Sequence, residues 1–402
     1  MSDYTLRKSP FFDFLNRYGE YDYESFLARS VEDIDYIKWH GYCLTMAYGD
    51  AAAEYDAVRG SCALFDASPV KKYSITGADA GSFLDFVLTR PMSSRQPMHV
   101  YYALLCNDGG MLLDDGLLFK FAADNYLLMV SEVDHGRHFA DASQRFDDLQ
   151  IAEVTSSLCG LALQGPASCA VLNSFGLTAI EKLKPFEIKA FGFGDGELTV
   201  ARVGFTADLG YELWFKPDLN KAIEWAFSVA ETELDMRIVG YGLDALQALR
   251  LEGGFIVPGW DTAQKFEDNE YERSPAELGL DWAVDLDRKP DFIGKTALLK
   301  EKKNGLRFQL IGMTIDRECK LENGAEIYAT IDGEVMQVGT LSSVAWSYGL
   351  HCWLGLASIR SEFIGDRPKY HVKFAGNPIA CRPAKLPFVK IGRYREVPAP
   401  IA

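Results

Sequence analysis

The most informative part of the chain is the stretch Leu198-Thr-Val-Ala-Arg-Val-Gly-Phe-Thr-Ala-Asp-Leu-Gly-Tyr-Glu-Leu-Trp-Phe215. Its apolar and β-branched residues fall into two runs, 198–204 and 210–215, and the Thr-Ala-Asp-Leu segment between them is typical of a turn. Helical spacing follows over 219–234 and again over 243–251, where it ends at a Gly-Gly pair. This order predicts two strands joined by a turn and followed by two helices.

The preceding part of the chain also mixes strands and helices. Leu64–Ile75 predicts a strand, and Ala78–Leu88 predicts an amphipathic helix. A run of further strands, interrupted by the hairpin-type turn Asn107-Asp-Gly-Gly110, is predicted over 101–106, 113–121 and 126–131. The aromatic and acidic opening residues resemble an arm that packs on the body of the protein.

The pattern changes near residues 298–306, a charged segment at which we place a domain boundary. Beyond it only strands and turns are predicted, over 308–314, 324–331, 334–341, 353–359 and 370–374. Their regular spacing and glycine-containing turns predict a small antiparallel barrel or sandwich. The fold class is therefore mixed α+β with a β-rich C-terminal domain.

Composition excludes several classes of function. The 402 residues carry 41 Lys and Arg against 57 Asp and Glu, a net charge of −16, which disfavours binding to nucleic acid or to an anionic membrane. The eight cysteines are scattered without a C-x-x-C pair, as expected for reduced thiols in a reducing compartment. The N-terminus has no apolar signal core, and no run approaches the roughly 18 apolar residues of a membrane span. We expect a soluble, cytoplasmic protein.

Generic chemical motifs are mostly absent. His135-Gly-Arg-His138 places two rings on one helical face without a carboxylate or cysteine at ligand spacing, so we expect an exposed helix face and no metal site. Phe191-Gly-Phe-Gly-Asp-Gly196 runs into a strand and not into a helix, which indicates a β-turn and not a nucleotide loop. On these tests alone the chain is an α+β protein without an assigned reaction.

Several segments in order resemble the aminomethyltransferase (glycine-cleavage T-protein) family. Val203–Leu213 is similar to its R-T-G-Y-T-G-E-x-G-[YF]-E-[LI] motif, and Gly242–Glu252 is similar to G-L-G-A-R-D-x-x-R-L-E. Ser274-Pro-Ala-Glu-Leu-Gly-Leu-Asp-Trp282 followed by Asp291-Phe-Ile-Gly-Lys295 is similar to S-P-x-E-x-G-L-x-W followed by D-F-[IV]-G-[KR]. The resemblance is collinear from about residue 40 to residue 390.

The resemblance implies a three-domain cloverleaf around a central channel that holds tetrahydrofolate. On this basis residues 1–40 form an N-terminal arm, 41–298 form a folate-binding region of two intertwined α+β domains, and 306–392 form a C-terminal β-barrel. The implied activity is one-carbon transfer with a small substrate as partner, and the oligomeric state is left open.

The resemblance also implies roles for individual residues. Glu212 would accept hydrogen bonds from the amino edge of the pterin in a two-pronged, charge-assisted way. Phe205, in the place of the motif tyrosine, and Tyr102 would line the cofactor site. Asp114 would stand beside the reacting N5/N10 edge, where a carboxylate can order the cofactor. A one-residue bulge would give that position to Asp115 instead.

Three departures from the family pattern bear on the reaction. Leu246 replaces the motif arginine, which removes a cation from the implied channel. The segment after the central helix is longer than in the family and carries Trp260, which could hold a methylated onium or an aromatic methyl ether, or could only pack the loop. Trp346 lies where the family has a turn and is a further candidate for contact with the substrate.

These departures favour transfer of a methyl group from a small S-, N- or O-methylated substrate to tetrahydrofolate. A glycine-cleavage-type aminomethyltransferase is the alternative reading. A non-catalytic folate-binding protein is a third, and it is disfavoured because the chain lacks the cysteine motif of those relatives after the central helix.

Overall fold

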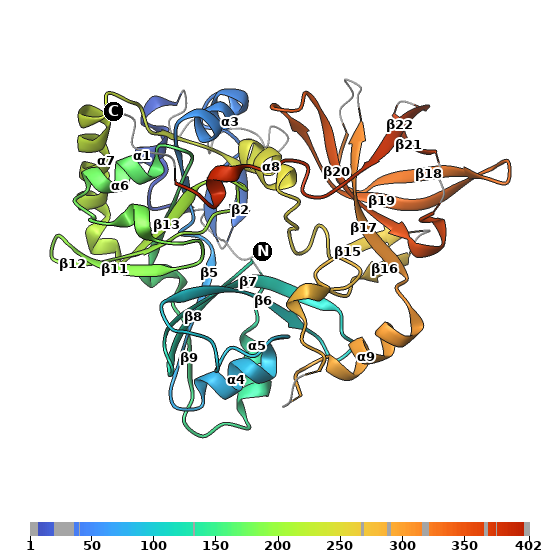
Figure 1. The fold of residues 1–402 in the computed structure, drawn as a ribbon, viewed down its shortest axis with the longest axis horizontal. Coiled ribbons are helices and arrows are strands. Elements are labelled where there is room, and N and C mark those ends of the chain that lie inside the picture. Colours follow the sequence, from blue (N-terminus) through green and yellow to red (C-terminus); the bar gives the residue numbers. More distant parts are fainter. Residues whose placement is uncertain are drawn as a thin grey trace.

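The computed structural model describes residues 7–19, 36–39, 41–131, 133–266, 269–287, 291–315, 321–365, 369–374 and 376–397. The chain forms three lobes, each built around one of its larger sheets (Figure 1). Two lobes mix helices with strands and the third is a closed barrel. The predicted α+β class with a β-rich C-terminal barrel is confirmed.

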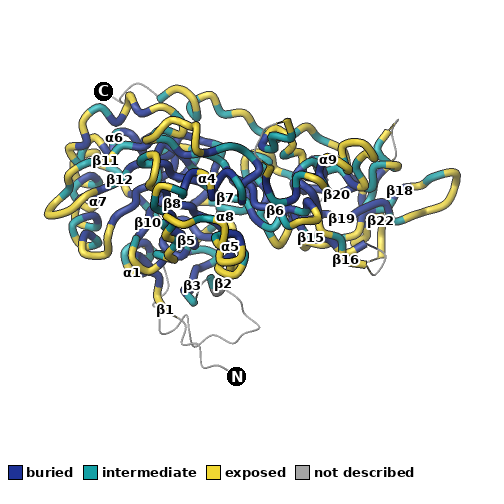
Figure 2. Tube along the Cα trace, turned by 90° about the horizontal axis from the view of Figure 1, so that it is seen from below, coloured by how far each residue is buried: buried dark blue, intermediate teal, exposed yellow. Residues whose placement is uncertain are grey.

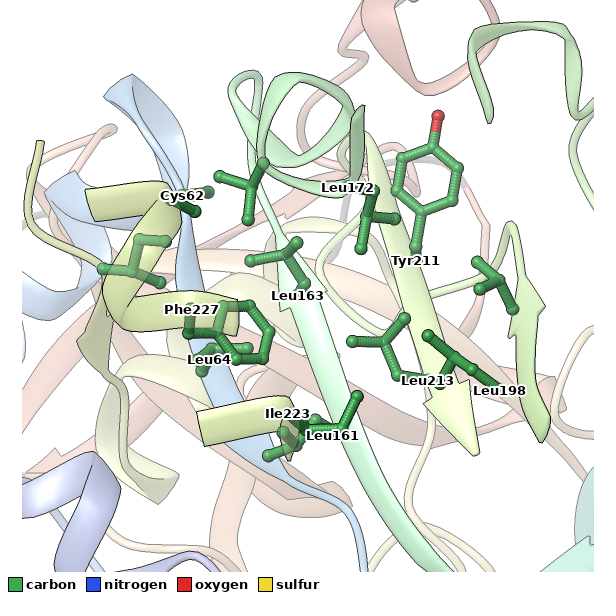
Figure 3. Packing of buried hydrophobic residues seen from close by; sticks show 14 of the residues in the cluster. Cys62, Leu64, Leu161, Leu163, Leu172, Leu198, Tyr211, Leu213, Ile223 and Phe227 are labelled. Carbon is green, nitrogen blue, oxygen red and sulfur yellow. The ribbon is translucent and has the colours of Figure 1, made fainter. Parts of the chain in front are cut away.

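The first lobe is built on a six-stranded sheet. In spatial order its strands are β11 (Ile188–Phe193), β12 (Gly196–Ala201), β13 (Gly210–Phe215), β10 (Cys159–Gln164), β4 (Ala63–Asp66) and β14 (Val239–Gly240). Helices α6 (Ser168–Ser174) and α7 (Asn220–Glu233) cover its outer face with side chains such as Leu172 and Phe227, which meet Leu161 and Leu213 of the sheet (Figure 3). We call this contact the outer cluster.

The second lobe is built on a five-stranded sheet. Its order is β6 (His99–Cys106), β7 (Leu112–Ala122), β8 (Asn125–Val130), β5 (Lys71–Thr76) and β9 (Gln150–Glu153). One face packs against α4 (Ala80–Val87) and α5 (Gly136–Ser143) through residues such as Leu118, Phe83 and Phe139. The chain enters this sheet after β4 and leaves it before β10, so the first two lobes are interleaved in sequence.

The single strand predicted over 64–75 is wrong, because the structure divides it between two sheets. β4 ends at Asp66 and β5 begins at Lys71. The four residues between them form a turn in which the Val70 amide donates to the Ala67 carbonyl (3.1 Å). Pro69, inside this turn, has no amide to give to a strand ladder.

The third lobe is a closed six-stranded barrel. Its order is β17 (Phe308–Ile315), β20 (Cys352–Arg360), β19 (Glu334–Ser347), β18 (Ala325–Ile331), β21 (Tyr370–Phe374) and β22 (Asn377–Ala384). Helix α9 (Lys295–Asn304) leads into it, and the hairpin of β15 (Ala263–Phe266) and β16 (Asn269–Glu272) precedes that helix. The sequence did not predict β22, whose prolines at 378 and 383 disguise a strand that closes the barrel against β17.

The N-terminal segment packs on the first lobe where it is described. β1 (Arg7–Lys8), β3 (Tyr42–Thr45) and β2 (Tyr36–Trp39) form a small sheet, followed along the chain by α3 (Ala51–Gly60). Phe11, just before α1 (Phe12–Leu15), is buried in the outer cluster and donates its amide to Asp66 (3.0 Å). Residues 1–6, 20–35 and 40 of the predicted arm lie outside the described residues.

A second apolar cluster joins the two sheets and α8 (Leu243–Glu252), and we call it the central cluster. It collects side chains from the inner faces of both sheets, namely Ala63, Phe65, Val100, Phe119, Leu127, Met129, Ala162, Ala201 and Trp214. Helix α8 adds Leu243, Ala248 and Leu249. Exposed residues lie mostly on outer loops and helix surfaces (Figure 2). No helix in the described part of the chain is long and apolar enough to cross a bilayer.

Candidate active site

Strand β13 presents alternate residues to the outer and the central cluster. Glu212 lies opposite Ala162 and Ala201 on the neighbouring strands, and both of these alanines belong to the central cluster. Because side chains alternate along a strand, Leu213 points the other way, into the outer cluster. Glu212 and Trp214 therefore face the interior between the two sheets.

Glu212 is half-buried and only partly satisfied by the protein. Trp214 donates its Nε1–H to Oε2 (3.2 Å), while Oε1 accepts no hydrogen bond from the described residues. Burial raises the pKa of Glu212 to about 7, against a smaller lowering by the Trp214 hydrogen bond. The interior between the sheets thus holds a carboxyl group with a free acceptor oxygen.

Lys72 lies behind Trp214 and is fully buried. It pairs with Met129 across β5 and β8, which places it on the inner face of the five-stranded sheet. Its Nζ lies 5.2 Å from the centre of the Trp214 ring and donates to the carbonyls of Ser68 (2.8 Å) and Val70 (2.6 Å). Burial lowers the pKa of Lys72 to about 8. No sequence pattern marked this residue beyond its place in a strand.

A β-bulge at the start of β7 determines which aspartate faces the interior. Leu105 pairs with Asp114 and Cys106 with Leu112, so Leu113 is left without a partner on β6. The next pair, Leu104 with Asp115, lies on the inner face that also carries Tyr102. Asp114 consequently lies on the opposite face, towards α4 and α5.

Asp114 is fully buried, and its carboxylate is used within the protein. Its Oδ1 accepts the Asp115 amide (2.9 Å), and its Oδ2 accepts the Ser131 hydroxyl (2.9 Å) and contacts His135 Nε2 (2.6 Å). The residue that the resemblance placed at the reacting edge therefore faces away from the interior. The expected exposed helix face is also corrected, because His135 is 2% exposed and anchors the start of α5 to Asp114.

Asp115 is half-buried beside Tyr102, whose hydroxyl donates to Oδ2 at 2.5 Å. Burial raises the pKa of Asp115 to about 7; the Tyr102 hydrogen bond lowers it, and the nearby charges of Asp114 and Asp261 raise it further. A carboxyl group with this pKa exchanges a proton near neutral pH, the property expected of a general acid or base.

Tyr102 also stacks on Trp282, which the sequence reading did not select although it ends a quoted motif. The two ring centres are 5.6 Å apart with an angle of 17° between the planes. Trp282 is 60% exposed, which is unusual for so large an apolar side chain. Its position at the end of the Ser274–Trp282 motif was the available signal, and the structure places it inside the 3-10 turn Asp281–Ala283.

The remaining predicted residues do not all come together. Leu246 on α8 is half-buried against the central cluster, so the position of the family arginine does face the interior. Phe205 is 38% exposed and stacks on Phe255 (5.2 Å, 16°). Trp346 is not in a turn. It lies in β19 opposite Trp353 of β20, and the centres of the two rings are 6.0 Å apart.

The long segment after α8 divides into packed and exposed aromatic residues. Phe266 and Tyr271 of the β15–β16 hairpin pack on Phe308 of the barrel, with ring centres 6.1 and 5.5 Å apart. Trp260 is 41% exposed and lies above Arg250, whose Cζ is 6.0 Å from the ring centre. Trp260 is the most exposed of these three aromatics.

A buried ion pair beneath Trp260 ties α8, the long segment and the barrel together. Arg250 Nη1 donates to Asp261 Oδ2 (3.3 Å) and to the Phe255 carbonyl (2.8 Å). Asp261 also accepts hydroxyl hydrogen bonds from Ser342 and Ser343 of β19. Removing one partner of such a pair would leave a buried charge uncompensated. The pair holds Asp261 where its charge raises the pKa of Asp115. The sequence did not predict this ion pair.

Comparisons with known proteins agree with this architecture. The family model described as the GCVT N-terminal domain matches residues 34–288, and the glycine cleavage T-protein C-terminal barrel domain matches residues 309–390. The crystal structure of the glycine cleavage system aminomethyltransferase T from Bartonella henselae superposes with a TM-score of 0.79 at 21% identity, covering 98% of this chain and 100% of that one.

The proteins of similar sequence are also described as aminomethyltransferases. The aminomethyltransferase of Halothermothrix orenii is 29% identical over 388 residues, which span 96% of this chain and 100% of that protein. The aminomethyltransferase of a Geobacillus species is 27% identical over 387 residues, 96% of this chain and 99% of that protein. The two family models together account for most of the chain in the expected order, and the chain belongs to the glycine-cleavage T-protein (GCVT) family.

Proposed function

We propose that this chain is a tetrahydrofolate-dependent one-carbon transferase. The observation that carries the proposal is that Glu212 and Asp115, two half-buried carboxyl groups on different sheets, both face the interior where the sheets meet. Burial raises both pKa values to about 7. Carboxyl groups with perturbed pKa values that converge on one interior are the common signature of a catalytic site.

Glu212 fits the recognition of the pterin ring. Its Oε1 is free, Trp214 fixes Oε2, and the central cluster supplies apolar surface for a flat heterocycle. An ionised carboxylate accepts two donors in a row, such as the amino and ring N–H groups of a 2-amino-4-oxo pterin. Binding in this manner requires the deprotonated form of Glu212.

Asp115 fits the reacting edge of the cofactor, and it takes the role that the sequence left open between two aspartates. Tetrahydrofolate supplies a nucleophilic nitrogen that accepts the one-carbon unit. Asp115 would order that edge and hold or release a proton near neutral pH, with Tyr102 fixing the carboxyl group at 2.5 Å. Asp114 positions Asp115 from behind through the backbone amide.

The one-carbon donor that the relatives favour is an aminomethyl group. The similar chains from Halothermothrix orenii and Geobacillus are aminomethyltransferases by name and are matched over nearly their full length. By the family resemblance this donor would be carried on a lipoylated protein, and the products would be ammonia, methylenetetrahydrofolate and the carrier with its lipoyl thiol released.

A methylated small molecule is the second candidate donor, and Leu246 is the observation in its favour. The side chain faces the central cluster where the family motif has arginine, so the interior has lost one cation. Trp260 offers an exposed ring to a methylated cation or an aromatic methyl ether. The products would be 5-methyltetrahydrofolate and the demethylated compound.

The products discriminate between these donors. The protein would be incubated with tetrahydrofolate and either an aminomethylated lipoyl carrier or a panel of S-, N- and O-methylated compounds, and ammonia and folate products would be quantified. Ammonia with methylenetetrahydrofolate supports the first donor, and 5-methyltetrahydrofolate supports the second. Absence of both products, together with no heat of tetrahydrofolate binding in calorimetry, would overturn the proposal.

A further inference from the structure

Arg90 is a half-buried cation without a carboxylate partner in the described part of the chain. Its Nη2 donates to the Tyr102 carbonyl (2.8 Å), and its Nε is buried with no hydrogen-bond partner. Burial lowers the pKa of Arg90, and the neighbouring charge of Arg95 lowers it further. A cation in this setting is stabilised when an anion arrives, because a guanidinium presents donors suited to a planar carboxylate.

The guanidinium of Arg90 lies against an exposed aromatic platform. Its Cζ is 5.4 Å from the centre of the Trp282 ring, which also stacks on Tyr102. With 60% of its surface exposed, Trp282 can accept a second flat group. Tyr102 connects this corner directly to Asp115 through its hydroxyl.

The location of Arg90 contrasts with the charge of the whole protein. The chain carries a net charge of −16, yet the two arginines of this loop, Arg90 and Arg95, have no ion pair in the described structure. Long-range attraction would not bring an anion to so acidic a protein. Binding at this corner must therefore come from short-range contacts with Arg90 and Trp282.

We propose that Arg90 and Trp282 form a subsite for an aryl or acyl carboxylate, which Trp282 holds by stacking and Arg90 by a charge-assisted hydrogen bond. The proposal rests on the proposed function, since the p-aminobenzoyl-glutamate end of tetrahydrofolate has this chemistry. A donor substrate that carries a carboxylate has it too. Arg90 would place a cation near Tyr102, whereas the interior has Leu246 where the family motif has an arginine.

Calorimetry on three matched ligands tests the subsite. Wild type, Arg90→Gln, Arg90→Lys and Arg95→Gln would be titrated with tetrahydrofolate, with 6-methyltetrahydropterin, which lacks the tail, and with p-aminobenzoyl-glutamate alone. We expect Arg90→Gln to weaken tetrahydrofolate about 10- to 30-fold and to leave the tail-less pterin within about twofold. Arg90→Lys should lose less, and Arg95→Gln, which removes the same charge from an exposed site, should match wild type.

The outcomes separate the subsite from the proposed function. The subsite is overturned if Arg90→Gln weakens the binding of tetrahydrofolate and of the tail-less pterin equally. It is also overturned if Arg90→Gln weakens the binding of no carboxylate ligand. Both outcomes leave the proposed function standing. Arg90-dependent binding of p-aminobenzoyl-glutamate without any pterin binding supports the subsite and overturns the function. If tetrahydrofolate affinity is unchanged but the KM of a carboxylated donor rises about tenfold, the carboxylate is that of the donor.

Discussion

The two faces of the six-stranded sheet are built from the same strands and serve different ends. Towards α6 and α7, β10 and β13 present Leu161, Leu163 and Leu213, all of them sealed in the outer cluster (Figure 3). Towards the interior, β13 presents Glu212 and Trp214. Adjacent residues of one strand thus belong to a sealed core and to a site with a free acceptor oxygen.

The difference between the two faces shows that the inner face carries a polar group that does not contribute to stability in the way the apolar outer face does. On the outer face the leucine side chains of β10 and β13 gain by leaving water. On the inner face burial raises the pKa of Glu212 to about 7, which means that its charged form is disfavoured in the folded protein. A polar group kept in such a place without a full set of partners is best explained by a ligand that completes it.

The sharpest test compares one substitution on each face of β13. Glu212→Gln should weaken tetrahydrofolate binding about 50- to 100-fold, because a charge-assisted acceptor becomes a neutral amide that also presents a donor. Leu213→Ala should cost roughly 2–5 kcal/mol of unfolding free energy by opening a cavity and should leave the affinity of the folded protein unchanged. Calorimetry and urea denaturation measure the two effects. Equal loss of affinity in both variants would contradict the division between the faces.

The same test on β7 compares two adjacent aspartates. Asp115→Asn should lower kcat about 100-fold with little change in stability, since it removes the titrating group beside Tyr102. Asp114→Asn should cost about 1–3 kcal/mol of stability, because His135 and Ser131 lose a charged acceptor. Single-turnover kinetics and thermal unfolding check the pair. A larger kinetic effect from Asp114→Asn would show that the bulge does not assign the roles.

The inner face should also respond to pH. Glu212 is ionised above its pKa of about 7, so tetrahydrofolate affinity should rise about tenfold between pH 6 and pH 8. Stability should change in the opposite sense, because the folded chain retains protons on Glu212 and Asp115 that the unfolded chain has released. Their contribution to the unfolding free energy falls as pH rises to about 7, from 3.8 for Asp115 and from 4.5 for Glu212. Glu212→Gln should remove the rise in affinity. A wild-type affinity that does not change with pH would refute this account of Glu212.

The smallest effect concerns the cation behind Trp214. Lys72→Met should weaken tetrahydrofolate about threefold, because the ammonium group 5.2 Å from the ring orients and polarises the indole that holds Glu212. Lys71→Met is the matched control, since Lys71 lies on the other face of β5 and pairs with Asp134 (3.3 Å) and Glu153 (3.6 Å). Binding isotherms at pH 7.5 decide it. If both variants lose affinity alike, the effect comes from general destabilisation of β5.

Sequence reasoning predicted the elements better than their contacts. Periodicity predicted α4, α7, α8 and most strands, and the collinear motifs led to the correct α+β family and barrel. It did not predict α3, or α9, which the structure places where a domain boundary was expected. The division of 64–75 between two sheets was missed, because periodicity records which residues are apolar and not which sheet receives them. The strand at 377–384 was missed for another reason. Its two prolines argue against a strand, but they are tolerated here because β22 pairs with β17 over only three residues.

The candidate site was predictable where a motif names the residue and the strand pattern fixes its direction, as for Glu212. It was not predictable where partners come from distant parts of the chain. Lys72 meets Trp214, and Arg90 meets Trp282, across separations that no local pattern encodes. Trp346 was assigned to a turn because the family motif has one there, whereas β19 continues through it to Ser347.

The unpaired Leu113 has a consequence for how chains of this kind can change in length. The bulge leaves Leu113 outside the ladder. The pairs Leu105–Asp114 and Leu104–Asp115 would therefore form in the same way if the strand lacked that residue. An insertion at this point is absorbed before it reaches the aspartates. Counting forward from Gly110 therefore misplaces the inward-facing carboxylate by one position, whereas counting back along the ladder from Leu117 and Tyr102 places it correctly.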